Sequence, residues 1–102
     1  MERPTITTID GTQHIMRDLR GRDWRLLGEF ADDAPSYIDA DFLEKHAAFV
    51  AKFFDGVTAD DILDLPIEDI FPASIAVRNF ITAQIGAKLE AIEKNSVADK
   101  AP

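Results

Sequence analysis

The segment from Asp39 to Asp55, Asp-Ala-Asp-Phe-Leu-Glu-Lys-His-Ala-Ala-Phe-Val-Ala-Lys-Phe-Phe-Asp, carries the strongest helical pattern in the chain. Its large side chains recur every three or four residues, as on the buried face of an amphipathic helix, at Phe42, His46, Phe49, Val50 and Phe53. Acids at its start suit the positive end of the helix dipole, and Gly56 is a typical helix stop. We therefore expect a helix over residues 39–55.

Downstream, the sequence predicts a short helix and then a long one. Thr58 with Asp61 three residues later is a helix-start signature, so we expect a helix from Thr58 to about Leu65. Proline fits the first turn of a helix better than its interior. Pro66 and Pro72 therefore predict a turn over residues 66–71 and a final helix over residues 72–94.

Upstream, the pattern changes to short strands and a short helix. Residues 5–9 are rich in β-branched side chains, and Asp10-Gly11 suits a two-residue type I′ turn, so we expect a β-hairpin over about residues 5–19. Asp23 favours a helix start, and Trp24, Leu27, Phe30 and Ala31 share a helical face. We expect a helix ending near Asp32, with Trp24 as its large core anchor.

These elements predict a mainly α fold, a small helical domain of about four helices with a long C-terminal helix and an N-terminal β-hairpin. A chain of 102 residues is the size of one domain. We assign residues 1–95 to that domain and expect residues 96–102 to form a frayed tail.

The long final helix has apolar residues on two sides and must therefore contact two partners. Large residues form one stripe, and a second, mostly small stripe lies about a quarter turn or more away. The helix is either central within the domain, or it has one core face and one docking face. In the second case we expect the docking surface to comprise Phe71, Ile75, Ala76, Phe80, Ala83 and Ala87.

Composition excludes several classes of function. The net charge is −8, and residues 26–75 hold twelve acids against Lys45 and Lys52, so the chain lacks the basic surface needed to bind nucleic acid irrespective of sequence. The absence of cysteine excludes disulfides and thiolate chemistry. The longest segment without charge, residues 79–87, is too short for a membrane span, and no signal peptide is recognisable. We expect a cytoplasmic protein that binds neither nucleic acid nor membrane.

No catalytic, cofactor or metal motif is recognisable. The acids at residues 39–44 and 60–64 coincide with helix starts and lack the Asp-x-Asp-x-Asp-Gly loop of calcium sites. His14 and His46 lack zinc-site spacing, and we expect His46 to be packed in the core or at its edge. The arginines at 17, 20, 22 and 25 are expected to pair with the acidic middle of the chain or to be solvated, although a phosphate-binding patch stays open. We expect neither an enzyme nor a cofactor.

The order of these elements and the sequence segments that connect them resemble those of a known family. They include a β-type opening, then Leu19-Arg-Gly-Arg-Asp23, a middle amphipathic helix, Asp55-Gly-Val-Thr-Ala-Asp-Asp-Ile-Leu-Asp-Leu-Pro66, and a long helix ending Lys88-Leu-Glu-Ala-Ile-Glu-Lys-Asn95. Over nearly its whole length, the chain resembles the small tail assembly chaperones of long-tailed bacteriophages of Gram-positive hosts.

The resemblance implies a binding function in the host cytoplasm. Such chaperones coat the long, helical, aggregation-prone tape measure protein before the tail tube polymerises around it, and they are absent from the mature virion. A ribosomal frameshift extends a fraction of them, and the longer form offers a contact to the tail tube protein. Residues 93–95 can be encoded GAA-AAA-AAC, which contains the slippery heptamer A-AAA-AAC. The resemblance carries no residue-level binding motif, and a homo-oligomer stays open.

Three other functions compete with this one. A small acidic phage-type inhibitor could mimic nucleic-acid phosphates and bind a basic host enzyme. The chain could also be a plain helical domain with an unrelated partner. A small hydrolase is the most distant alternative, because the sequence offers no nucleophile paired with a base.

Overall fold

The computed structural model describes the backbone of residues 2–100 and the side chains of residues 2–86. The elements in chain order are β1 (Thr5–Thr7), β2 (Gln13–Ile15), α1 (Gly21–Asp32), α2 (Phe42–Ala51), α3 (Ala59–Leu63) and α4 (Ile67–Lys100). This confirms the predicted class, mainly helical with four helices, a long C-terminal helix and an N-terminal hairpin.

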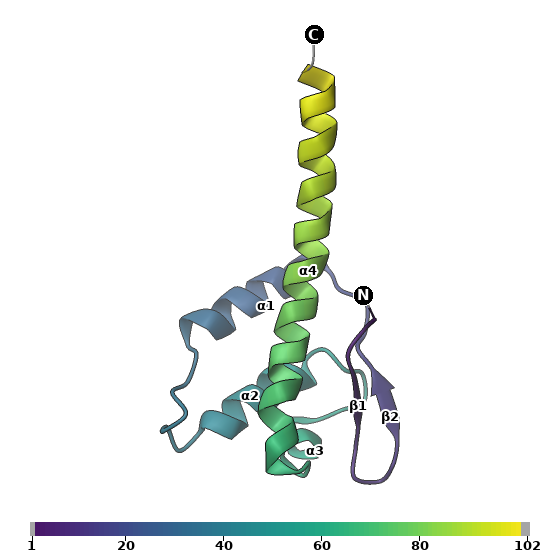
Figure 1. The fold of residues 1–102 in the computed structure, drawn as a ribbon. Helices are drawn as coiled ribbons and strands as arrows, with labels where there is room; N and C mark the ends of the chain where they lie inside the picture. Colours follow the sequence, from purple (N-terminus) through teal and green to yellow (C-terminus); the bar gives the residue numbers. More distant parts are fainter. Residues whose placement is uncertain (1, 101–102) are drawn as a thin grey trace.

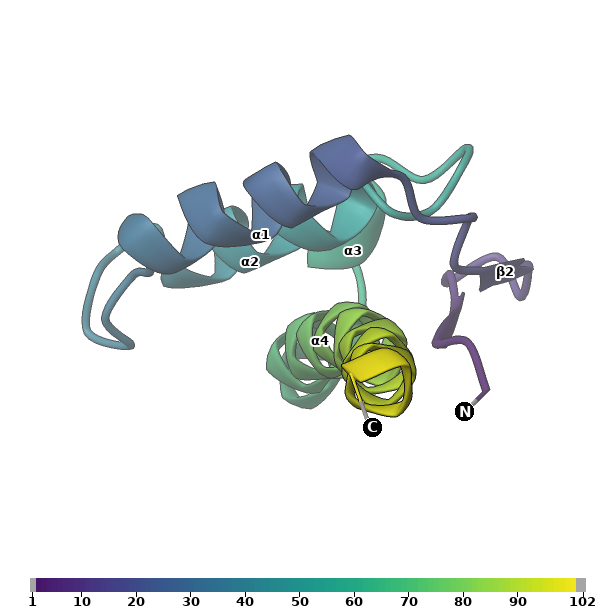
Figure 2. The ribbon, with the colours of Figure 1, turned by 90° about the horizontal axis from the view of Figure 1, so that it is seen from above.

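The helices form two layers. Helices α1, α2 and α3 lie together on one side, and α4 crosses them while the hairpin flanks the assembly near the N-terminus (Figure 1, Figure 2). The C-terminal half of α4 projects beyond the other elements, which gives the molecule a longest dimension of 58 Å against 30 and 21 Å (Figure 1).

The core lies where α2 crosses α4, as the apolar periodicity of residues 42–53 predicts. His46, Ala47, Phe49 and Val50 of α2 are buried. They belong to one buried apolar cluster with the turn after α2, α3, the hairpin segment and the first half of α4, whose largest members are Phe49, Phe53, Phe54, Met16, Ile62, Ile70 and Ile81.

Helix α2 is shorter than predicted at both ends. It begins after Asp41 and ends at Ala51. Beyond that point the amides of Phe53 and Phe54 donate to the carbonyls of Val50 and Ala51, three residues back instead of the four of an α-helix. These tighter turns carry the chain to Gly56, whose φ of 77° is the left-handed conformation that glycine adopts without strain. The predicted stop at Gly56 therefore ends the turn rather than the helix.

The start of α3 is confirmed at the level of its cap. The Thr58 hydroxyl accepts a hydrogen bond from the Asp61 amide at 3.2 Å, and the Asp61 carboxylate accepts one from the Thr58 amide at 3.0 Å. This reciprocal pair satisfies two amides that have no partner inside the helix.

The predicted turn over residues 66–71 was wrong, because α4 already begins at Ile67 and includes Pro72. A proline inside a helix removes one backbone hydrogen bond and costs about 3 kcal/mol. The early start puts Ile70 on the buried face of α4, and the burial of this apolar side chain helps to offset the loss. At its other end α4 continues past the predicted Lys94 to Lys100. The frayed tail stays a prediction, and residues 101–102 lie outside the described part.

The predicted hairpin is confirmed, but its two-residue turn was wrong. Ile6 pairs with His14 in the antiparallel register, and the Thr8 amide donates to the Thr12 carbonyl at 3.0 Å. The loop therefore has three residues, 9–11, with Gly11 in the left-handed conformation at a φ of 87°. The Asp10 carboxylate accepts from the Thr12 amide at 2.9 Å and fixes the loop from inside.

Candidate partner-binding site

A groove of about 720 Å³ lies between the segment that leads into α1 and the middle of α4. One wall is the loop and first turn of residues 17–24, and the other is one face of α4. The lining residues are Arg3, Arg17, Asp18, Leu19, Arg20, Gly21, Asp23, Trp24, Phe80, Ile81, Gln84 and Ile85. We call it the Trp24 groove.

An ion pair between Arg17 and Asp23 holds the first wall in place. The guanidinium donates from Nη1 and Nη2 to the two carboxylate oxygens, each at 2.9 Å, in a bidentate arrangement. The Arg17 Nε also donates to the Lys52 carbonyl at 3.0 Å, and the Arg17 amide donates to the Phe53 carbonyl at 2.9 Å. Arg17 therefore ties the segment before α1 to the end of α2.

Asp23 is only 1% exposed although it is charged. Besides Arg17, it accepts the Arg20 amide at 2.7 Å, which satisfies a backbone group at the start of α1. The hydrogen bonds from Arg17 are the largest influence on this carboxyl and hold the pKa of Asp23 below its usual range. The same pairing raises the pKa of Arg17, so both groups stay charged.

The inward turn of Asp23 explains why Trp24 is not the core anchor that the sequence predicts. Successive helix residues are about 100° apart, so an inward Asp23 turns the next side chain toward the surface. Trp24 is 50% exposed and forms part of the groove wall. Phe30 takes the anchoring role instead, stacked on Phe49 with a centroid distance of 4.3 Å.

Arginine side chains give the groove a basic rim in an acidic protein. Three arginines and two aspartates line it. Arg3 pairs with the exposed Asp18, whereas the Arg20 side chain forms no ion pair with any described residue. The prediction that Arg17 pairs with the acidic middle was wrong, because its partner, Asp23, lies six residues away in the N-terminal quarter.

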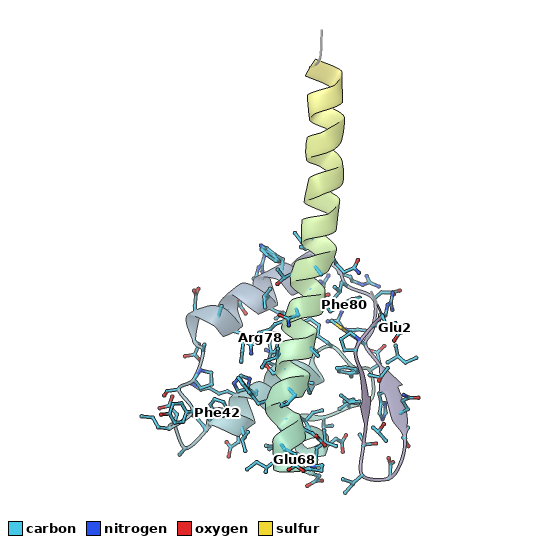
Figure 3. The ribbon with its side chains drawn as sticks, in the orientation of Figure 1. Glu2, Phe42, Glu68, Arg78 and Phe80 are labelled. Carbon is cyan, nitrogen blue, oxygen red and sulfur yellow. The ribbon has the colours of Figure 1, made fainter. Side chains whose placement is uncertain are left out.

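The second wall of the groove is apolar. Phe80 and Ile81 form its floor and are buried, and the half-buried Ile85 continues it toward the projecting part of α4. Figure 3 shows Phe80 on the side of α4 toward the hairpin and Arg78 on the side toward α1. An apolar floor with a polar rim is the usual anatomy of a site for a helical segment.

The structure does not gather the six predicted docking residues on one exposed face. Phe80 belongs to the core and lines the Trp24 groove. Phe71 and Ile75 are partly exposed on the α2 side of α4, with Phe71 5.5 Å from Phe42 between ring centroids. Ala76 is exposed and Ala83 half-buried on the other side of the helix, and the side chain of Ala87 lies outside those described. Because Phe80 is buried, these residues do not form one continuous exposed face, and their role in partner binding stays a prediction.

A buried hydrogen bond links His46 of α2 to Ser74 of α4. Nδ1 of His46 lies 2.8 Å from Oγ of Ser74, and the two residues are 3% and 0% exposed. Three phenylalanine rings surround the imidazole at centroid distances of 4.5 to 5.1 Å, from Phe30, Phe42 and Phe71. This burial, with a smaller effect of the Arg78 charge, lowers the pKa of His46 and keeps the ring neutral.

The His46–Ser74 distance is that of a base and nucleophile, which the sequence pattern missed because the residues lie 28 positions apart. A nucleophile must also reach a substrate, and the Ser74 hydroxyl is fully buried. The pair therefore satisfies two buried polar groups and joins α2 to α4. The prediction that His46 is a packed histidine of the core is confirmed, and the ring lies inside the core rather than at its edge.

Among the described side chains, no group of three or more histidines and carboxylates is placed to hold a metal ion. No described helix has the length and apolar character needed to cross a membrane. Neither the protein-family models, nor the curated proteins, nor the solved structures with which the chain was compared gave a match. The features that bear on function are therefore the geometry of the Trp24 groove and the order of elements along the chain.

Proposed function

We propose that the protein is a tail assembly chaperone of a long-tailed bacteriophage that binds a helical segment of the tape measure protein and keeps it soluble. The observation that carries the proposal is the Trp24 groove, in which a half-exposed tryptophan stands beside Phe80, Ile81 and Ile85. A tape measure helix exposes apolar side chains before the tube forms, and such side chains fill a groove of this kind.

Two further features support the proposal. The order of elements over nearly the whole chain resembles this family, and binding without chemistry needs no cofactor. Each bound copy would add a net charge of −8, so complexes coated with many copies would repel one another and stay in solution. In this proposal the chaperone acts in the host cytoplasm and leaves before the virion matures. Contact with the tail tube protein through a frameshifted form is part of the same proposal.

The test uses the chain's one tryptophan as a probe of the groove. A tape measure fragment is titrated into the full chain, and Trp24 fluorescence is recorded together with the fragment's solubility on co-expression. Binding in the groove buries the indole, so the emission should shift to shorter wavelength as the fragment becomes soluble. A soluble complex without a change in Trp24 emission would place the fragment elsewhere, and an insoluble fragment at every ratio would contradict the function.

Matched variants separate the groove from the alanine side of α4. Ile85→Glu puts a charge on the groove wall, Ala83→Glu puts one on the predicted small stripe, and the exposed Asn79→Glu is the control. We expect Ile85→Glu to weaken fragment binding at least about tenfold, because it buries an unpaired carboxylate, while Asn79→Glu changes it little. Loss of binding in Ala83→Glu alone would show that the fragment binds the predicted small stripe of α4 and not the Trp24 groove.

The alternative, an acidic inhibitor that mimics nucleic-acid phosphates, is favoured by one observation. Six carboxylates lie between Lys52 and Arg78 with no lysine or arginine among them, at residues 55, 60, 61, 64, 68 and 69. Binding to a basic enzyme through these charges would fall steeply with salt, whereas apolar binding in the groove would tolerate salt. Repeating the titration from low to high salt distinguishes the two functions.

A further inference from the structure

A second exposed apolar surface lies at the start of α4, away from the Trp24 groove. Ile67, Phe71 and Ile75 follow one another at four-residue spacing on one side of the helix and are 69%, 40% and 37% exposed. Phe42 of α2 lies beside Phe71, with ring centroids 5.5 Å apart. We call these four residues the Phe71 ridge.

The ridge is the face of this helical segment that the fold leaves exposed. Ile70, Ser74 and Val77 occupy the neighbouring face and are buried against α2 and the core. The Phe71 ring packs edge to face on the His46 ring, with centroids 5.0 Å apart, and 40% of the Phe71 surface stays exposed. Three large apolar residues in a row at a helix surface are unusual unless something covers them.

The surroundings of the ridge are acidic. Glu68 follows Ile67 in the first turn of α4, and Asp39 and Asp41 lie in the turn that leads into Phe42 (Glu68 and Phe42 are labelled in Figure 3). The nearest basic side chain along α2, Lys45, is paired with Asp33 and Asp41 at 3.4 and 3.7 Å. The other nearby cation, Arg78, stands over the Phe30 ring at 5.5 Å.

We propose that the Phe71 ridge docks an amphipathic helix of a partner protein whose apolar stripe is flanked by lysine and arginine. Residues at i, i+4 and i+8 form a ridge that fits between the side-chain rows of another helix. Basic flanks on that helix would meet the carboxylates of Glu68, beside Ile67, and of Asp39, in the turn before Phe42. A second copy of this chain is a poor occupant, because apposed ridges would bring these same carboxylates together. The inference does not rest on the proposed function.

The test uses two synthetic helical peptides with one leucine stripe, flanked by lysine in one and by glutamate in the other. Their binding to the full chain is measured by fluorescence anisotropy of a labelled peptide. We expect the lysine-flanked peptide to bind at least about tenfold more tightly, since both share the apolar contact and differ only in charge. Equal binding of the two peptides would overturn the proposal.

Two ridge variants and a matched control locate the binding site. Ile67→Glu and Phe71→Glu place a carboxylate on the ridge, whereas Ala76→Glu places one on an exposed position of the same helix outside it. If attraction between charges alone held the lysine-flanked peptide, all three variants would bind it as tightly as the unchanged chain or more tightly. On the proposal, both ridge variants weaken binding at least about tenfold, because they remove apolar contact, and Ala76→Glu does not.

Ile67 is the safer of the two ridge positions, since its side chain is mostly exposed and its replacement leaves the core intact. Circular dichroism of each variant checks that the helices persist. Tight binding of the lysine-flanked peptide to Ile67→Glu would contradict the proposal, as would self-association of the unchanged chain that Ile67→Glu abolishes in size-exclusion chromatography with light scattering. A ridge variant that loses the peptide but keeps the Trp24 response to a tape measure fragment would separate the two surfaces.

Discussion

The chain satisfies two polar pairs by opposite means, a part-buried charged pair beside the Trp24 groove and a buried neutral pair between α2 and α4. Beside the Trp24 groove, Arg17 and Asp23 are both charged and satisfy each other through two hydrogen bonds of 2.9 Å. Between α2 and α4, His46 and Ser74 share one hydrogen bond of 2.8 Å among phenylalanine rings, and the imidazole is neutral. Full charge needs a complete set of partners, whereas a neutral pair tolerates an apolar cage.

The difference also separates what each pair does for the molecule. Arg17 bonds to the backbone at residues 52 and 53, so its pair positions a wall of the candidate site relative to α2. The His46–Ser74 pair joins two helices deep in the core and touches Phe71, which leads to the acidic end of α4. One pair therefore supports the groove and the other supports the ridge.

The largest effect is expected from breaking the charged pair. Asp23→Ala leaves the Arg17 guanidinium without its carboxylate and removes the partner of the Arg20 amide, so we expect a loss of about 3–5 kcal/mol in the free energy of unfolding. Urea denaturation followed by circular dichroism measures it. The control is Asp18→Ala, since Asp18 pairs with Arg3 at the exposed surface and should contribute about 1 kcal/mol or less. Similar losses of stability in both variants would contradict a special role for the Arg17–Asp23 pair.

The neutral pair is expected to cost less when one partner is removed. Ser74→Ala leaves the buried Nδ1 of His46 without its hydrogen bond, which typically costs about 1–3 kcal/mol. Thr82→Ala is the control on the same helix, because the Thr82 hydroxyl bonds only to the Arg78 carbonyl at an exposed position and should change stability by about 0.5 kcal/mol or less. A Ser74→Ala protein as stable as Thr82→Ala would show that the imidazole needs no partner.

The two pairs should also respond to acid at different pH. Burial lowers the pKa of His46 below 6.5, so between the two values the unfolded chain holds a proton that the folded chain lacks. Stability must then fall as pH drops below about 6.5, by up to about 1.4 kcal/mol per pH unit. Asp23 follows the same sign at lower pH, because its pKa is lowered from 3.8 and its contribution is lost as pH falls through the folded value.

Replacing His46 by leucine tests this order of events. The first decline, which begins near pH 6.5, should vanish in His46→Leu, and the decline below pH 3.8 should remain. His14→Gln removes the other histidine, in the hairpin, and should keep the first decline. Denaturation midpoints in urea measured from pH 7 to pH 3 provide the comparison, and an unchanged first decline in His46→Leu would refute the assignment.

The smallest effect on stability is expected at Trp24, in contrast to the buried Asp23 next to it. Because half of the indole surface already faces solvent, Trp24→Ala should cost less than about 1 kcal/mol, whereas a buried anchor such as Phe49→Ala should cost about 3–5 kcal/mol. Circular dichroism in urea measures both, since the first variant lacks the chain's one tryptophan. A loss for Trp24→Ala as large as that of Phe49→Ala would make Trp24 a core residue after all.

Most of the fold follows from local pattern. The periodicity of residues 42–53 predicts the buried face of α2, and Thr58 with Asp61 predicts the start of α3 to the residue. The predicted start of α4 was wrong because proline prefers the first turn of a helix, and the burial of Ile70 overrides that preference. That burial depends on α2 and α3, and no local rule contains it.

The candidate site was predicted only in part, for a related reason. Phe80 was among the predicted residues and does line the groove, but Trp24 was assigned to the core. Its true direction depends on Asp23, which turns inward only because Arg17 reaches it from outside the helix. The six-residue separation of an arginine and an aspartate is common in sequences, so nothing local marks it as a buried bidentate pair.

The bonds from Arg17 to residues 52 and 53 have a consequence for the order in which the chain assembles. They span 35 residues, so the segment after β2 cannot reach its place until α2 and its terminal turn exist. The Arg17 amide should therefore exchange with solvent deuterium only when that whole unit opens, as slowly as the amides of α2, although the neighbouring hairpin has just two short strands. Arg17 thus joins the N-terminal residues to the most cooperative part of the molecule.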